Sequence, residues 1–395
     1  MGIIMHVFAR RRRGLLLSAG LAAVLLAALA GPASADADAQ GGSVTRPRPA
    51  GLLQQAVNAI HGTGTVGVLA EVRSPGTHHS ARAGTAELGT GRPVPRGGSF
   101  RIGSATKTFT ATVVLQLVGE GQMSLDDTVE HWLPGVVQGN GHDGRRITVR
   151  QLLQHTSAIP DVLGDIPALN SAAGYRAERL RTYTSEELVA LAMRHPATND
   201  PGVWSYSNTN YILAGMIIKK VTGHSWADEV NARIIGPLRL TKTSTPGSSP
   251  SIPGPHAHGY RGFGTGTALD VTEFNPSAVD ASGSIISSAD DLSRFYTALF
   301  DGRLLDPARL DEMTTTVSAP ELKAEYGLGL AKFSLPCGGS YFTHVGGVSG
   351  YRTQVGVTPD ATRTTVVLAT GDGDKNTQKA MSRLMEQGLC RSKVQ

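Results

Sequence analysis

The chain has 395 residues, of which 40% are hydrophobic and 17% are charged, and its formal net charge is +5. This length and balance suit one large or two medium globular domains, and they exclude a fibrous or largely disordered protein. Residues 10–13 are four arginines and account for four of the five net charges. The remainder is nearly neutral, so we expect no nucleic-acid partner.

The first 35 residues have the pattern of a secretory signal. The basic cluster at 10–13 precedes an apolar stretch at 15–30, and Ala33-Ser34-Ala35 offers small residues for cleavage. The alternative is an anchor that stays in the membrane, but the cleavage pattern follows the apolar stretch directly. We therefore expect a secreted, extracellular protein without a permanent anchor, cleaved near Ala35. Residues 36–50 are small, polar and proline-containing, and they predict a disordered terminus.

Strand patterns lie at both ends of the remaining chain, and helix patterns lie in the middle. The predicted helices cover 52–60, about 103–118, 149–155, 185–194, 209–221, 225–235, 289–299 and 376–389. The predicted strands cover 65–73, 80–88, 326–330, 340–344, 351–358 and 364–370. The fold class is therefore α/β (α+β): one antiparallel sheet from the N- and C-terminal segments, flanked by helices, with an inserted all-helical domain. We place the folded domain at 51–395, with a sheet lobe at 51–98 and about 280–395 and a helical lobe at about 99–279.

Ser104-Ala105-Thr106-Lys107 opens the predicted helix near 103 and holds the one serine that a lysine follows by three residues. The two side chains lie one turn apart on one helix face. The first turn offers Ser104 unpaired backbone N–H groups, and burial favours the neutral form of Lys107. A neutral amine beside a hydroxyl can act as a general base. The pattern is thus the minimum for a serine acyl-enzyme, although it also arises by chance.

Tyr206-x-Asn208 directly precedes the predicted helix at 209–221. A tyrosine whose pKa is lowered by a nearby ammonium can relay a proton to a leaving group, and the asparagine can bind a substrate amide. The alternative interpretation is structural, because asparagine is a good helix N-cap and the tyrosine could lie in the core.

His344-Val345-Gly346-Gly347 follows at the end of a predicted strand. Glycine lets the backbone approach a bound ligand, and a backbone N–H here could form an oxyanion hole together with that of Ser104. An ordinary turn at the end of the strand is the alternative.

The three patterns, in this order, resemble the family of serine D-alanyl-D-alanine carboxypeptidases and class C β-lactamases, which are penicillin-recognising hydrolases. That family is marked by Ser-x-x-Lys, Tyr-x-Asn and a Lys/His-Thr-Gly strand. The likeness runs from about 52 to 390 and includes the stretches 101–118, 147–161, 206–225, 282–292 and 326–330. It implies a β-lactamase/transpeptidase-like fold and an acyl-serine mechanism without cofactor or metal. By position it makes Ser104 the nucleophile, Lys107 its base, Tyr206 the proton carrier to the leaving group, Asn208 a ligand of the acyl amide, His344 the source of local charge, and Gly346 and Gly347 part of the substrate site.

Two cysteines, Cys337 and Cys390, lie late in the chain. In an exported protein we expect them to form a disulfide, with two buried thiols as the alternative. Two distant cysteines supply too few ligands for a metal. The exported actinobacterial-type carboxypeptidases that the chain resembles have a similar late pair.

The chain departs from the family pattern at the residues that hold a substrate carboxylate. Val345 replaces the family's threonine. Ala331 follows the Gly-Leu-Gly-Leu stretch where the carboxypeptidases have an arginine, and Lys332 is one position off, on the other face of a strand. Both departures argue against a carboxylate-terminated substrate, since an unpaired buried carboxylate is costly.

Other patterns are weaker. His155 follows a helical stretch and is expected to shape a loop rather than to catalyse. Glycines at 62, 64 and 67 match a dinucleotide fingerprint, but a helix precedes them and a strand follows, which is the wrong order. The chain has no Gly-x-Ser-x-Gly and no His-Glu-x-x-His, so neither an α/β-hydrolase elbow nor a zinc protease motif is present.

We therefore expect a monomeric serine hydrolase with D-alanyl-D-alanine carboxypeptidase-like action on peptidoglycan peptides, and with β-lactams as inhibitors. The alternatives are a carboxylesterase or amidase acting on a small ester or amide with the same fold, which Val345 and Ala331 favour, and a β-lactamase. A catalytically silent penicillin or cell-wall binder is the alternative from another functional class.

Overall fold

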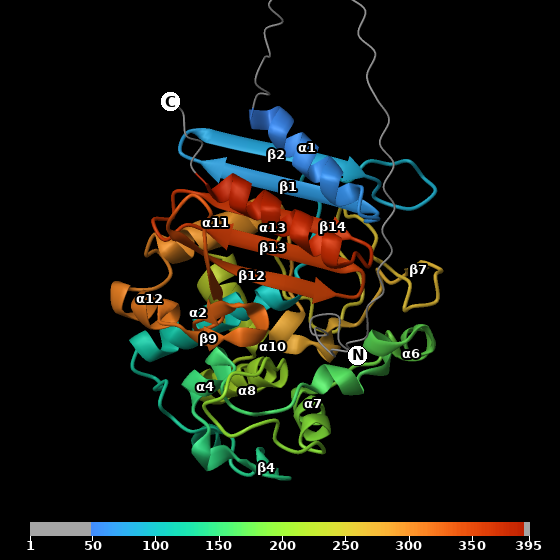
Figure 1. Cartoon of the computed structure of the whole chain (residues 1–395). Coiled ribbons are helices and arrows are strands. Elements are labelled where there is room, and N and C mark those ends of the chain that lie inside the picture. Colours follow the sequence, from blue (N-terminus) through green and yellow to red (C-terminus); the bar gives the residue numbers. More distant parts are fainter. Residues whose placement is uncertain (1–48, 391–395) are drawn as a thin grey trace, which may run out of the picture.

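A computed structural model describes residues 49–390 of the chain (Figure 1). The predicted signal at 1–35 and residues 36–48 of the predicted disordered terminus lie outside the described residues. Residues 49 and 50 of that terminus form the start of the first helix. Within 49–390, none of the helices has the length and apolar character that crossing a membrane requires.

An antiparallel sheet of eight strands joins the two ends of the described chain, as the sequence predicts. Its strand order is β2-β1-β14-β13-β12-β11-β10-β9, and β1 pairs with β14 along its length. The strands are β1 (Gly67–Ser74), β2 (Thr77–Gly84), β9 (Val317–Ala319), β10 (Ala324–Tyr326), β11 (Ala331–Ser334), β12 (Ser340–Val348), β13 (Tyr351–Val357) and β14 (Thr364–Thr370). Two-residue strands form three further pairs: β3 (Phe100–Arg101) with β8 (Ile286–Ser287), β4 (Gln138–Gly139) with β5 (His142–Asp143), and β6 (Tyr260–Arg261) with β7 (Leu269–Asp270).

Helices cover both faces of the large sheet (Figure 1). The terminal helices α1 (Pro49–His61) and α13 (Lys375–Leu389) pack side by side on one face, and α11 (Ala289–Phe300) covers the other. Apolar residues recur on α11 at the spacing of one helix face, namely Leu292, Phe295, Tyr296 and Leu299. Because helices cover both faces of the sheet, all seven residues of β14 are buried.

The remaining helices gather beside the sheet and around α2 (Thr106–Gly119). They are α3 (Val129–Trp132), α4 (Val149–Gln154), α5 (Pro167–Asn170), α6 (Ala172–Glu178), α7 (Ser185–Ala192), α8 (Thr209–Thr222), α9 (Trp226–Val230), α10 (Asp280–Gly283) and α12 (Pro307–Thr314). Short turns η1 (Gly103–Ala105), η2 (Gly144–Arg146), η3 (Val162–Asp165), η5 (Pro276–Ala278) and η6 (Pro320–Leu322) are 3₁₀-helical, and η4 (Asn231–Ile235) continues α9 as a π-helix. As predicted, α2 is buried on nearly every side.

One predicted strand is wrong. Residues 327–330 form a turn in which the Gly327 N–H donates to the Leu330 carbonyl at 2.9 Å, and the strand β11 begins only at Ala331. Gly329 has a φ of +80°, and a methyl group there would lie 3.0 Å from the Lys107 carbonyl oxygen. The turn is therefore shaped by its contact with α2, which a local strand pattern does not reveal. The hairpin strand β2 also starts and ends earlier than the predicted 80–88.

The disulfide Cys337–Cys390 is present and ties the β11–β12 turn to the end of α13. The two cysteines are separated by 53 positions in sequence. The cross-link thus holds the last helix against the strands that it covers.

We predict that the double variant C337S/C390S unfolds at a lower temperature than the wild type. Closing a loop of this length contributes about 4 kcal/mol in the chain-entropy account of disulfides. Thermal unfolding followed by circular dichroism measures the effect, and wild type kept in reductant serves as the control. Equal midpoints for all three samples would contradict a stabilising bond.

Candidate active site

Ser104 lies where β3 runs into the helix α2. The chain turns through Gly103, whose φ of +53° is favourable for glycine, and Ser104 follows within the short turn η1. A methyl group on Gly103 would lie 2.7 Å from the Gly347 nitrogen, so only a glycine lets this turn approach β12 so closely. Ser104 is buried, and its backbone N–H belongs to η1, the turn that directly precedes α2.

Lys107 lies one turn further along and has no solvent-exposed surface. Its Nζ donates to Asn208 Oδ1 at 2.6 Å and to the Ser282 carbonyl at 2.9 Å, and it lies 3.3 Å from Ser104 Oγ. Three acceptors from separate parts of the chain therefore surround one buried amine.

The surroundings of Lys107 change its protonation. Burial lowers the pKa of the Lys107 ammonium to about 7, and the Asp161 carboxylate opposes this shift through its negative charge. A large fraction of the amine is then neutral at physiological pH. A neutral amine within reach of a serine hydroxyl has the geometry and the basicity of a general base.

Tyr206 is the third residue that the sequence predicts, and the structure brings it to the same cluster. Lys107 Nζ lies 4.9 Å from the centroid of the Tyr206 ring, over its face. Within residues 49–390 the Tyr206 hydroxyl is buried without a hydrogen-bond partner. Burial raises the pKa of this phenol, although the neighbouring Ser104 hydroxyl opposes the rise. The pKa of Tyr206 is therefore raised and not lowered as expected, because desolvation outweighs the effect of Ser104. The phenol is neutral at rest and can donate a proton.

Asn208 bridges the amine and a carboxylate. Its Oδ1 accepts from Lys107, and its Nδ2 donates to the two Asp161 oxygens at 3.2 and 3.0 Å. Asn208 occupies the N-cap position of α8, as the structural alternative predicted, but its side chain makes no capping bond there. Both ends of the amide are engaged, and a substrate amide would have to replace one of these partners.

His344 does not supply a charge. Burial lowers the pKa of its imidazole to about 3, and the positive Lys107 adds to the effect. Its Nδ1 lies 2.8 Å from the Val345 carbonyl oxygen, which can only accept, so Nδ1 carries the proton. Nε2 then accepts from the Tyr326 hydroxyl at 2.9 Å. The expectation that His344 sets the local charge is therefore corrected: the ring is neutral and anchored at both nitrogens.

Gly346 and Gly347 belong to β12 and lie against the turn before Ser104. A methyl group on Gly346 would lie 1.9 Å from the Ile102 carbonyl oxygen, so the backbones are in close contact. Gly347 is exposed, and a methyl group there would meet nothing within 4 Å. Pairing of β11 with β12 ends at Thr343, so β11 does not cover the final part of β12. The Gly347 N–H thus lies near Ser104 at an accessible strand end, which suits an oxyanion hole.

Two residues of this cluster escaped the sequence analysis. Ser282 contributes a main-chain oxygen, which leaves no signature in its side chain. Asp161 is an exposed residue beside Asn208. Its carboxylate accepts a hydrogen bond from the Leu163 N–H at the start of η3. An aspartate in that position is typical of a helix cap, so the sequence gives no separate sign of a site.

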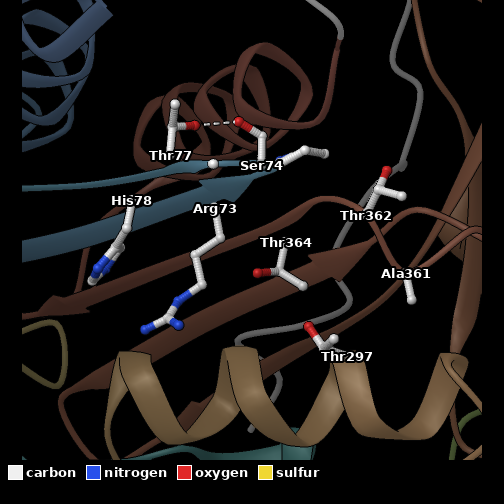
Figure 2. A pocket seen from close by; sticks show the side chains of 10 residues that line it. Arg73, Ser74, Thr77, His78, Thr297, Ala361, Thr362 and Thr364 are labelled. Carbon is white, nitrogen blue, oxygen red and sulfur yellow. Dashed lines mark hydrogen bonds between the residues drawn. The ribbon is translucent and has the colours of Figure 1, made fainter.

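A surface hollow lies elsewhere. It measures about 530 Å³ and is bordered by the β1–β2 turn, the start of β14 and α11 (Figure 2). Arg73 lines it and forms an ion pair with Asp290. None of the candidate residues reaches this hollow, so we assign it no part in the chemistry.

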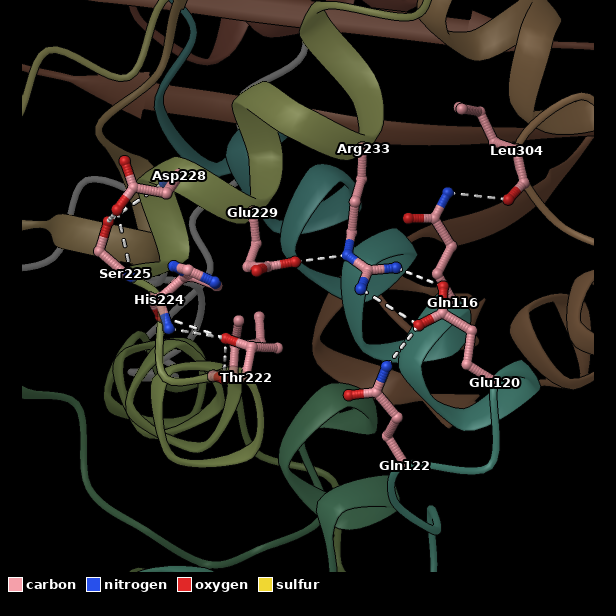
Figure 3. A network of polar contacts seen from close by, with 11 residues as sticks. Gln116, Glu120, Gln122, Thr222, His224, Ser225, Asp228, Glu229, Arg233 and Leu304 are labelled. Carbon is pink, nitrogen blue, oxygen red and sulfur yellow. Dashed lines mark hydrogen bonds and ion pairs between the residues drawn. The ribbon is translucent and has the colours of Figure 1, made fainter.

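A polar network holds the far end of α2. Arg233 pairs with Glu120 and with Glu229, and the Gln116 amide donates to the Leu304 carbonyl at 2.9 Å (Figure 3). These contacts tie the end of α2 to η4 and to the segment before α12. They fix the helix that carries Lys107 at the end opposite Ser104.

Comparison with known proteins identifies the family. A profile of the β-lactamase family, described as "Beta-lactamase", matches residues 52–389. The chain belongs to the β-lactamase family. All residues of the candidate site lie within the matched range. The fold and the resemblance expected from the sequence are confirmed, and the protein is a serine hydrolase of the β-lactamase and penicillin-binding fold.

Several known proteins are similar to this chain. A D-stereospecific amidohydrolase from Streptomyces sp. has 43% identity and a TM-score of 0.78, covering 84% of this chain and 96% of its own. A D-amino acid amidase from Ochrobactrum anthropi SV3 has 27% identity and a TM-score of 0.74, covering 85% and 96%. Penicillin-binding protein 4* of Bacillus subtilis is 28% identical over 324 residues, which are 78% of this chain and 68% of that protein.

We predict that kcat/KM rises with pH through an acid limb near pH 7, where the Lys107 ammonium loses its proton. The variant K107R should lose about 10²- to 10⁴-fold in kcat at every pH, because a guanidinium stays protonated. Steady-state rates between pH 5 and 9 measure both effects. Substantial activity in K107R, with its structure intact, would rule out this amine as the base.

Proposed function

We propose that the protein hydrolyses small amides of D-amino acids through an acyl-serine intermediate. The observation that carries this proposal is the exposed Asp161 carboxylate beside the Ser104–Lys107–Asn208 cluster. It makes no ion pair within the described part of the chain, so it is available for the free ammonium group of a substrate. The D configuration is supported by the relatives, since both structural neighbours named above are D-specific by name.

The proposed reaction uses the cluster in two steps. Ser104 Oγ attacks the amide carbon while neutral Lys107 takes its proton, and the N–H groups of Ser104 and Gly347 stabilise the oxyanion. The Tyr206 phenol protonates the leaving nitrogen, the C–N bond breaks, ammonia departs, and the Lys107 ammonium returns a proton to Tyr206. Water then attacks the acyl-serine by the reverse proton path and releases the D-amino acid.

Asp161 suits a cationic acyl group. Desolvation raises the pKa of the Asp161 carboxyl, while hydrogen bonds from Leu163 and Asn208 and the positive charge of Lys107 oppose the rise. A bound ammonium would further favour the ionised form. N-acylated peptides and penicillins have no such ammonium, so this residue discriminates between substrate classes.

Within residues 49–390, the positions that hold a leaving-group carboxylate in the carboxypeptidase pattern supply no cation. Ala331 is buried in an apolar cluster with Trp204 and Tyr326, and Tyr206 packs against the same cluster. Lys332 points away and pairs with Glu325 at 3.2 Å. A leaving group without a carboxylate therefore fits this side better than a terminal D-alanine does.

Carboxypeptidase action on D-alanyl-D-alanine peptides is the second candidate, supported by the likeness to penicillin-binding protein 4*. We also propose that the protein is exported, because the Cys337–Cys390 disulfide suits an oxidising compartment.

We expect purified protein to release ammonia from D-phenylalanine amide faster than from its L enantiomer, and to release little D-alanine from a D-Ala-D-Ala peptide. The variant S104A should lose all turnover, since no other group in the proposed site can form the acyl intermediate. Chromatographic product assays measure the rates. Rapid D-alanine release with no amide turnover would favour the carboxypeptidase instead.

We expect D161N to raise KM for D-phenylalanine amide about 10- to 100-fold, as loss of a charge-assisted contact would. N-acetyl-D-phenylalanine amide should be affected far less, because it carries no ammonium. The matched control is D165N, which changes an aspartate on η3 that pairs with His195 at 2.8 Å. Equal effects of D161N on both amides would exclude ammonium recognition by Asp161.

A further inference from the structure

A buried histidine that the proposed reaction does not use lies directly behind Tyr206. His155 ends α4 with a φ of +62°, and it has no exposed surface. Its ring centroid lies 4.3 Å from that of Tyr206. A left-handed backbone position restricts the side chain to few types, among which asparagine and histidine are favoured.

His155 holds both neighbours of Tyr206. The Ser205 N–H donates to the His155 carbonyl at 2.8 Å, and the Ser207 N–H donates to His155 Nδ1 at 3.2 Å. The residues before and after the tyrosine are thus fixed to the same residue. Because Asn208 comes next in the chain, its position depends on the same pair of bonds.

A chain of hydrogen bonds fixes the tautomer of His155. The Ser157 hydroxyl accepts from the Ile159 N–H and donates to Asn210 Oδ1 at 2.6 Å. This turns the Asn210 Nδ2 group toward His155 Nδ1, at 3.3 Å. Backbone and amide N–H groups can only donate, so Nδ1 must be unprotonated and the proton lies on Nε2.

The imidazole is also kept neutral. Burial lowers the pKa of His155 well below its usual range, and the positive charge of Lys107 acts in the same direction. A neutral ring with a free Nδ1 lone pair is the form that the Ser207 N–H requires. The residue therefore acts as a fixed acceptor rather than as an acid or base.

We propose that His155 is the positioning residue for the Tyr206–Asn208 segment, and that its Nδ1 acceptor sets the phenol at the distance needed to protonate a leaving group. This inference rests on the proposed function, since it assumes that Tyr206 donates that proton. Its consequence is selective: substrates with a basic leaving group depend on His155, and substrates whose leaving group departs as an anion do not.

The test compares H155N with H155G, which both tolerate a left-handed backbone and both lack the ring. They differ in the side-chain oxygen of asparagine, which can replace Nδ1 as the acceptor for Ser207. We expect H155N to keep kcat for D-phenylalanine amide within about fivefold of the wild type, and H155G to lose about 100-fold with little change in KM. The acid limb of the pH profile should be the same in H155N and the wild type.

Leaving groups provide the specific readout. In H155G, turnover of D-phenylalanine amide and of its methyl ester should fall, as in Y206F, while turnover of the p-nitrophenyl ester should change less than threefold. Equal loss on all three substrates, equal impairment of H155N and H155G, or a shifted acid limb in H155N would overturn the proposal. If the wild type does not turn over the amide, the proposed function fails, and the two esters still test His155.

Discussion

The site depends on one interaction: the Lys107 amine is buried among hydrogen-bond acceptors from separate parts of the chain. Removing an amine from water is costly unless its N–H groups are satisfied. Here Asn208 and the Ser282 carbonyl satisfy it at hydrogen-bond distance, and Ser104 Oγ lies slightly further away. These groups come from the turn η1, from the segment before α8 and from α10. The amine can be buried only if those three elements meet, so the requirement that lowers its pKa also assembles the site.

The sheet reaches this cluster through glycine. Gly103 and Gly346 let the backbone of β12 contact the turn before α2 more closely than any side chain would allow. The contact brings an exposed strand end to the serine without a linking side chain. Polar chemistry therefore comes mainly from the helical elements, and the backbone N–H of Gly347 comes from the sheet. Neither part holds all the proposed groups alone.

The sequence predicted those features of the site that depend on residue type and spacing. It did not predict the features that depend on tertiary contacts. The spacing of Ser104 and Lys107, and the pattern at Tyr206, indicated groups that the structure does bring together. The charge states were mispredicted for Tyr206 and His344, because burial sets them and burial is not local. The turn at 327–330 looked like a strand because its contact with α2 is invisible in a short pattern. Short elements such as β9 and α12 gave too weak a periodicity to be predicted.

In the proposed function, the site recognises a positive charge on the substrate, whereas the carboxypeptidase pattern recognises a negative one. Ala331 and Val345 remove groups that would hold an anion, and Asp161 adds one that attracts a cation. Asp161 also raises the pKa of Lys107 by its negative charge, with Asn208 bonded to both. An ammonium bound at Asp161 would cancel that charge and lower the pKa of Lys107 further. A cationic acyl group would then do more than bind, because its arrival would increase the neutral fraction of the base that activates Ser104. The Asn208 side chain, which is bonded to both Asp161 and Lys107, would thus link substrate recognition to the activation of Ser104.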